Sequence, residues 1–351
     1  MVSTSLTVRL AERPFDSFIL GKHFYQEMTP MPSASDVRAS EILVETLYLS
    51  IDSAMREWVK DERSSLPPVP IGGVMRGFAV ARVLFSKSKL AIIGDLVTGF
   101  TGWSEHAILA EGAFDLVPGN PDVLAEPQKA LSTFGVSSLA AWWGMTKIGC
   151  PSPGETIVIS AAAGAVGSVA GQIAKIKGAR VVGICGSTEK CNWLTSELGF
   201  DVALNYKMED FESKFNEATG DLIDVYFDNV GGDILNMCLG RAKPRARFVE
   251  CGTISQYNKA SPEGPANFGK ISPMRLRVEG FVMLDHMDQI GGGQCEVGCW
   301  VAEGKLRFFE TIIKGGLQEA ERALINLFNG VNWGKLLVEV KDPATKPTVL
   351  G

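Results

Sequence analysis

The clearest chemical signal in the sequence is a turn of small residues, Ala161-Ala162-Ala163-Gly164-Ala165-Val166-Gly167. It has the pattern Gly-x-Gly-x-x-Gly, with Ala162 at the first glycine position. Gly164 lets the backbone approach a pyrophosphate, and Gly167 lets the following helix pack closely on its strand. The N–H groups and dipole at the start of such a helix bind an anion. We therefore expect a dinucleotide to contact Ala163, Gly164, Ala165, Val166 and Gly167.

The flanks of this turn support that interpretation. An apolar strand is predicted at 156–161. After the turn, apolar residues follow at helical spacing: Val166, Val169, Ala170, Ile173 and Ala174. A turn of small residues could also serve packing alone. Its place between a strand and an amphipathic helix favours cofactor binding.

The residues after the next predicted strand, 180–185, indicate which dinucleotide is bound. An NAD site places an Asp or Glu about 20 residues beyond the turn to hold the ribose. Here Gly186 and Ser187 leave room for a phosphate, and Lys190 supplies a positive charge. Glu189 is expected to point outward. The sequence predicts NADP(H), although Lys190 could also be a solvated helix residue.

Tyr257 is the candidate catalytic residue. It follows a predicted strand at 247–251, at the edge where doubly wound sheets bind their ligands. A phenol is protonated at neutral pH and can donate a hydrogen bond to a developing oxyanion. The alternative is a loop tyrosine whose ring packs on the sheet edge.

The residues that zinc or short-chain dehydrogenase chemistry requires are absent from the sequence. There are three histidines and no Cys-x-x-Cys, and the pair Cys295 and Cys299 lacks further ligands, so no metal is expected. None of the five tyrosines has a lysine four residues on. Reduction of a conjugated double bond needs only hydride transfer and one donor for the carbonyl oxygen. This is the chemistry that the residues favour.

The elements that must position these residues change character near residue 127. Residues 1 to 125 contain short apolar runs such as 42–48, 79–85 and 95–100, broken by Gly and Pro, which indicates a β-rich unit. Strands then alternate with helices, which is typical of a parallel α/β sheet. Further strands are predicted at 222–227, 247–251 and 278–284, and a late helix and strand at 320–328 and 335–340.

Composition excludes several function classes. With 46% hydrophobic and 21% charged residues, the 351-residue chain can form two globular domains. A net charge of −6 without a basic run argues against nucleic acid and anionic membrane surfaces. No apolar stretch reaches the roughly 18 residues of a membrane span. Seven scattered cysteines indicate reduced thiols and a cytoplasmic location.

Several motifs together carry a family resemblance. They are 161–168 (AAAGAVGS), 228–232, 251–258, 67–69, 75–77, 99–103 and 332–335. The sequence resembles the medium-chain dehydrogenase/reductase superfamily over nearly its whole length. It is most similar to the zinc-independent branch of leukotriene B4 12-hydroxydehydrogenase, prostaglandin reductase and the NADPH-dependent alkenal double-bond reductases.

The resemblance implies an α/β fold in which a doubly wound Rossmann sheet (128–300) is inserted into a GroES-like β-rich domain (1–127), which residues 301–351 complete. It implies that Lys190 and Tyr206 hold the 2′-phosphate and that Tyr257 is the donor. It also implies a homodimer. The other residues that it places at the cofactor are Asn229, Cys251, Thr253, Phe281 and Asn332.

The expected substrate pocket departs from the family pattern. Ala54 and Ser65 stand where relatives often have tyrosines, Trp142 stands where a tyrosine is common, and Trp103 belongs to a first-domain motif. Arg56 matches a family arginine, which is expected at the cofactor or at the pocket rim; the alternative is a structural salt bridge. Losing two rings predicts a wider pocket, one that accepts bulkier or aromatic enones.

The predicted function is NADPH-dependent reduction of the double bond of small α,β-unsaturated aldehydes and ketones. Two alternatives stay open. One is a quinone reductase or secondary-alcohol dehydrogenase on the same scaffold. The other is a protein that binds NADPH without turning it over.

Overall fold

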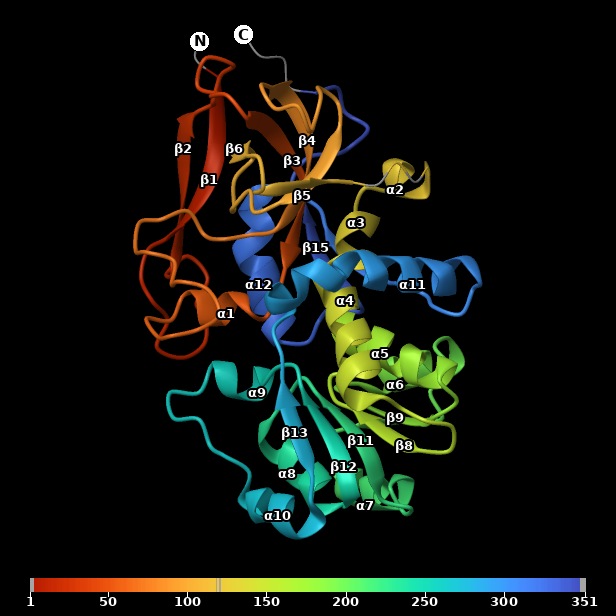
Figure 1. Cartoon of the computed structure of the whole chain (residues 1–351). Coiled ribbons are helices and arrows are strands. Elements are labelled where there is room, and N and C mark those ends of the chain that lie inside the picture. The colour runs from red at the N-terminus through yellow and green to blue at the C-terminus, as the bar shows by residue number, and fades with distance from the viewer. Residues whose placement is uncertain (1–2, 118, 120, 348–351) are drawn as a thin grey trace. The chain divides into compact units, whose positions relative to one another are not determined.

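The computed structural model describes residues 3–117, 119 and 121–347, which form two compact units (Figure 1). One unit comprises Met1–Leu131 and Glu310–Gly351, and the other comprises Ser132–Phe309. The boundary predicted for the end of the Rossmann domain is residue 300, nine residues before the end of the second unit. The segment after it stays with the second unit because Arg307 exchanges hydrogen bonds with Gln172 and Phe309 packs edge-on against the ring of Trp193.

The first unit is β-rich. A seven-stranded sheet has the order β14-β15-β3-β4-β5-β7, β6 pairs with β3, and β1 and β2 form a separate antiparallel pair. The strands are β1 (Thr4–Leu10), β2 (Phe24–Pro30), β3 (Glu41–Ile51), β4 (Ala79–Ser86), β5 (Leu96–Gly99), β6 (His106–Ala110), β7 (Phe114–Leu116), β14 (Glu310–Ile313) and β15 (Lys335–Glu339). The helices are α1 (Met55–Trp58), α2 (Pro121–Ala125), α3 (Lys129–Ser132), the 3₁₀ turn η4 (Leu317–Glu319) and α12 (Ala320–Phe328).

The three early apolar runs form β3, β4 and β5, which confirms the β-rich prediction. β3 is buried at ten of its eleven positions, because it lies inside the sheet between β4 and β15. The late helix and strand are α12 and β15, and β15 joins this sheet. The C-terminal segment therefore belongs to the β-rich unit.

The second unit is a doubly wound α/β fold. Its six strands are all parallel and have the order β10-β9-β8-β11-β12-β13. They are β8 (Thr156–Ile159), β9 (Arg180–Cys185), β10 (Val202–Asn205), β11 (Ile223–Asp228), β12 (Ala242–Glu250) and β13 (Arg277–Gly280). The strand predicted at 278–284 corresponds to β13, which ends at Gly280. It is shorter than expected because the chain enters a 3₁₀ segment at Met283.

The helices of this unit connect its strands. They are α4 (Val136–Trp143), the π-helix η1 (Gly144–Gly149), α5 (Ala165–Ile176), α6 (Thr188–Ser196), α7 (Phe211–Ala218), α8 (Gly232–Gly240), α9 (Ile254–Tyr257), η2 (Ala266–Lys270), α10 (Ile271–Met274), η3 (Met283–Gln289) and α11 (Ile290–Ala302). No helix among the described residues is long and apolar enough to cross a membrane.

The order of the strands determines where a ligand can bind. The chain runs outward from β8 through β9 to β10, and then returns to β11 on the other side of β8. The loops after β8 and β11 leave in opposite directions, and doubly wound sheets bind their ligands at the carboxyl ends of such strands. Figure 1 shows α9 at this end of the sheet and α10 at the other.

Candidate active site

The turn between β8 and α5 has the compact geometry that the sequence predicted. Gly164 is the extended N-cap of α5, and no side chain caps this helix. A Cβ on Gly167 would lie 2.4 Å from the carbonyl oxygen of Ala161, so only glycine fits beneath the helix. A Cβ on Gly164 would meet only that same oxygen, at 3.2 Å. The outer side of the turn is therefore open, and it fits the pyrophosphate of a dinucleotide.

The turn after β9 brings two cationic side chains together. Ser187 caps α6 by accepting the N–H of Lys190 at 3.2 Å. A Cβ on Gly186 would lie 3.2 Å from the ring of Tyr206 and 3.5 Å from Cε of Lys207. Lys190 is buried; its desolvation and the nearby charge of Lys207 lower its pKa.

Two adjacent cations beside a glycine turn suit the 2′-phosphate of NADP(H). Glu189 is exposed, as expected. Lys207 was not among the residues predicted from the sequence. Its position directly after Tyr206 was the only signal in the sequence.

A network of hydrogen bonds joins the carboxyl ends of β8 and β11. Oδ1 of Asp228 accepts the hydroxyls of Tyr226 and Ser160 at 2.7 and 3.1 Å. The same oxygen accepts the N–H groups of Val230 and Gly231 at 2.7 and 2.8 Å. Asn229 bonds back to Ser160 through its backbone N–H and its side-chain amide, each at 2.8 Å. These hydrogen bonds hold the turns after β8 and β11 together.

Glu250 adds a second buried carboxyl group to this network. It pairs in register with Asp228 across β11 and β12, so both side chains lie on the same face of the sheet. When both groups are ionised, Oδ2 of Asp228 and Oε1 of Glu250 are buried without a hydrogen-bond partner among the described residues. Burial, the charge of Asp228 and a hydrogen bond to it raise the pKa of Glu250 to about 8. Burial raises the pKa of Asp228 as well. Four donors favour the charge on Asp228, so Glu250 holds the proton at neutral pH.

Tyr257 lies in the turn after β12, at the same edge. Its hydroxyl accepts the N–H of Thr253 at 3.3 Å, and a Cβ on Gly252 would lie 3.0 Å from it. The backbone N–H groups of Cys251 and Gly252 both bond to the carbonyl oxygen of Asp228. The phenol is therefore held beside the β11 turn rather than out in solvent. Accepting a hydrogen bond also polarises its own O–H as a donor.

The α9 segment that carries Tyr257 is anchored on the neighbouring turn. Ser255 donates its hydroxyl to the carbonyl oxygen of Val230 at 2.6 Å, and the N–H of Ile254 bonds to the carbonyl of Asn229 at 3.2 Å. Gly232 has a φ of 56°, and a Cβ there would lie 2.6 Å from the amide nitrogen of Gln256. The Gly-Gly pair of the motif is required because α9 packs directly on it.

Three predicted pocket residues need correction, because their side chains are packed inside the units. Trp103 is fully buried in the core of the first unit, against Phe24. Arg56 is 2% exposed and donates to the carbonyl oxygens of Pro14 and Asp16. The ring of Trp142 is buried in the second unit, and its Nε1–H bonds to a carboxylate oxygen on α11 at 2.7 Å. These side chains stabilise the fold rather than line a pocket wall.

The remaining predicted site residues lie on both units. Ala54 and Ser65 are exposed on the first unit. Asn332, on the same unit, donates its amide to the carbonyl oxygen of Gly334 at 2.9 Å. Cys251 and Phe281 are half-buried and directly follow β12 and β13. The second unit by itself thus brings the two phosphate turns, Asn229, Cys251, Thr253 and Tyr257 to one edge.

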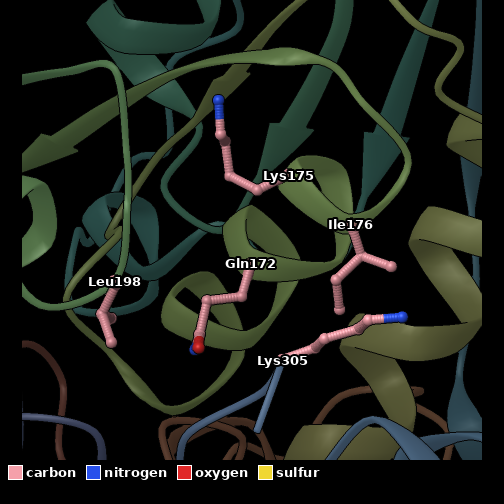
Figure 2. Close-up of a pocket in the computed structure, with 5 residues that line it drawn as sticks. All are labelled: Gln172, Lys175, Ile176, Leu198 and Lys305. Atoms are coloured by element: carbon pink, nitrogen blue, oxygen red, sulfur yellow. The ribbon is translucent and has the colours of Figure 1, made fainter. Parts of the chain in front are cut away.

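A surface depression elsewhere on the second unit does not belong to this site. It is lined by Gln172, Lys175, Ile176, Leu198 and Lys305 (Figure 2). It lies at the C-terminal half of α5, away from the carboxyl edge of the sheet. Lys175 and Lys305 point in different directions, and Lys175 is paired with Asp201 at 2.8 Å. They do not converge on a common ligand.

Comparison with known proteins identifies the family. Residues 7–117 match the family described as the N-terminal domain of oxidoreductase, and residues 165–290 match the family described as zinc-binding dehydrogenase. YfmJ of Bacillus subtilis, named an NADP-dependent oxidoreductase, is 38% identical over 98% of this chain and 100% of its own. The chain belongs to the zinc-independent branch of the medium-chain dehydrogenase/reductase superfamily. Within the described residues, no three His, Cys, Asp or Glu side chains form a group that could hold a metal ion.

Further members of the branch indicate the type of enzyme. The NADPH-dependent curcumin reductase of Escherichia coli is 38% identical over 86% of this chain and 88% of its own. The NADP-dependent 2-alkenal reductase of Nicotiana tabacum is 37% identical over the same shares. The crystal structure of CurA from Vibrio vulnificus in complex with NADPH superimposes with a TM-score of 0.90, at 34% identity, and covers 96% of this chain and 100% of its own. Prostaglandin reductase 1 of Rattus norvegicus is 37% identical over 93% of this chain and 97% of its own. The present chain is therefore an NADP-dependent oxidoreductase of the alkenal, curcumin and prostaglandin reductase type, which confirms the predicted cofactor, NADP(H).

Proposed function

We propose that this enzyme reduces the carbon–carbon double bond of α,β-unsaturated aldehydes and ketones. The observation that carries the proposal is the hydroxyl of Tyr257, held over Gly252 at the carboxyl edge of the sheet, beside the turns that fit the cofactor. The names of the curcumin and 2-alkenal reductases support the same class of substrate, because both compounds carry a double bond conjugated to a carbonyl.

The chain's own residues would act as follows. The turn from Ala163 to Gly167 binds the pyrophosphate, Lys190, Tyr206 and Lys207 bind the 2′-phosphate, and Asn229 and Cys251 lie toward the nicotinamide half. When bound, NADPH supplies a hydride to the β-carbon of the substrate. Tyr257 donates a hydrogen bond to the carbonyl oxygen, where the negative charge of the enolate collects. A proton from water or from the Tyr257 hydroxyl then reaches the α-carbon and completes the reduction.

The substrate pocket is proposed to be wider than in relatives with tyrosines at positions 54 and 65. Ala54 and Ser65 have small side chains and are exposed on the first unit. Smaller side chains leave room for bulkier substrates, such as aryl enones.

We also propose that two copies of the chain form a homodimer. Strand β13 pairs only with β12 among the described strands, and it leaves an edge of the sheet largely exposed. Such an edge is available to another strand. Light scattering on the purified protein would measure the assembly.

The deciding experiment follows NADPH consumption with enals, alkyl enones and an aryl enone, and identifies each product. Saturated carbonyl products support the proposal, and higher efficiency on the aryl enone supports the wider pocket. Turnover of simple quinones or alcohols without alkene reduction would instead support a quinone reductase or a secondary-alcohol dehydrogenase. Tight NADPH binding without any turnover would favour a non-catalytic protein.

A further inference from the structure

Two buried cysteines face each other beside the proposed 2′-phosphate turn. Cys185 is the last residue of β9, and Cys191 lies in α6, so the Gly186–Lys190 segment connects them. Their sulfur atoms are 3.3 Å apart. Their exposed fractions are 2% and 8%, whereas Cys150, Cys295 and Cys299 are exposed. Nothing in the proposed reaction uses this pair.

The geometry of the pair suits disulfide formation. A disulfide has an S–S distance of about 2.05 Å, so the sulfur atoms need to approach by little more than an ångström. The two thiols lie within hydrogen-bond distance, and either sulfur can donate to the other. The interaction with Cys185 lowers the pKa of Cys191, and the interaction with Cys191 together with burial raises the pKa of Cys185. Cys191 is thus the better nucleophile of the two, since the thiolate is the reactive form.

We propose that Cys185 and Cys191 form a reversible disulfide that weakens NADPH binding. The bond would draw the first turns of α6 toward the end of β9 and displace the segment that holds Ser187 and Lys190. The inference rests on the proposed position of the 2′-phosphate at this turn. It assigns a redox modification site to the same edge of the sheet.

The oxidant is a hydroperoxide. The Cys191 thiolate attacks its terminal oxygen, the O–O bond breaks, and a sulfenic acid and an alcohol or water form. The Cys185 thiol then attacks the sulfur of the sulfenic acid, and water leaves as the S–S bond forms. Two thiols lose two electrons and two protons in total, and the peroxide is reduced. A dithiol reverses the change by thiol–disulfide exchange.

The test treats the full-length protein with hydrogen peroxide, with and without NADPH, and maps disulfides by mass spectrometry after the free thiols are blocked. We expect a Cys185–Cys191 disulfide that dithiothreitol removes and that bound NADPH suppresses. The Kd for NADPH should rise about tenfold on oxidation, as expected when one charge-assisted contact is lost. Cys185→Ser and Cys191→Ser should abolish the effect of peroxide, and Cys150→Ser should retain it.

Two outcomes would overturn the inference. One is oxidation confined to the exposed cysteines while Cys185 and Cys191 stay reduced in the folded protein. The other is a disulfide that forms and leaves NADPH affinity unchanged. Lys190→Ala separates this failure from a failure of the phosphate site. If this variant also binds NADPH normally, the proposed turn is wrong. If it binds weakly, only the redox coupling is wrong.

Discussion

Glu250 and Asp228 lie side by side in the sheet, in register on adjacent strands, and burial beside Asp228 raises the pKa of Glu250 to about 8. Asp228 holds the β11 turn through Val230 and Gly231, and the Cys251–Tyr257 turn begins directly after Glu250. The pair therefore stands beneath both turns of the site. A carboxylate on each residue would place two like charges against each other in a buried position.

This relationship predicts that stability falls as pH rises. The folded state keeps the proton on Glu250 up to about pH 8, whereas an unfolded Glu releases it near its ordinary pKa of 4.5. The folded state therefore binds more protons between these values, and the free energy of unfolding decreases across this window as pH increases.

Glu250→Gln tests that prediction, because glutamine keeps a donor toward Asp228 but does not titrate. Urea unfolding near pH 5 and near pH 8 measures how much the free energy of unfolding falls as pH rises. This fall should be smaller in the variant than in the wild type, by on the order of 3 kcal/mol. The exposed Glu263→Gln serves as the control and should leave the decline unchanged. An equal decline in all three proteins would show that protonation of Glu250 does not contribute to the pH dependence of stability.

The two cations at the Gly186 turn should discriminate between cofactors. Lys190→Ala and Lys207→Ala should each raise the Kd for NADPH about tenfold, because each removes a charge-assisted contact to phosphate, and the Kd for NADH should change little. Fluorescence titration measures both. Lys259→Ala, on an exposed part of the same unit, should affect neither. An equal loss for NADH and NADPH would mean that these lysines act on the fold rather than on the phosphate.

The two glycines of the α5 turn should separate stability from binding. Gly167→Ala places a Cβ 2.4 Å from the Ala161 oxygen, so the backbone must shift, at a cost of about 1–3 kcal/mol in the free energy of unfolding. Gly164→Ala adds a methyl group with room on most sides, in a conformation that alanine accepts. It should leave stability nearly unchanged while NADPH affinity falls. Chemical denaturation and NADPH titration on both variants provide the comparison.

Tyr257 is expected to act in the reduction step. Tyr257→Phe removes the donor and keeps the ring, so kcat should fall about 100-fold, as for other single oxyanion donors, while NADPH affinity is preserved. Stopped-flow measurement of NADPH oxidation with an enone reports the step directly. The exposed Tyr25→Phe controls for loss of a phenol elsewhere. Full turnover by the Tyr257 variant would mean that the hydroxyl only stabilises the turn, by accepting the N–H of Thr253, and takes no part in the reduction.

Features carried by short contiguous stretches could be predicted from the sequence alone. The Ala161–Gly167 turn, the glycine turn with its lysine at Gly186–Lys190 and the position of Tyr257 after β12 all follow from local periodicity and residue type. The NADP(H) preference is confirmed, as is the α/β fold with a β-rich unit. These properties depend on the backbone conformation within a few residues, which composition and spacing determine directly.

Only the tertiary structure decided which distant side chains meet. The Asp228–Glu250 pair depends on the register of two strands that a crossover joins, and the Cys185–Cys191 contact depends on how α6 returns toward β9. Burial also overturned the pocket roles of Arg56, Trp103 and Trp142. Their types suit a pocket wall, but packing within each unit determines which face a side chain presents, and no local pattern records that packing.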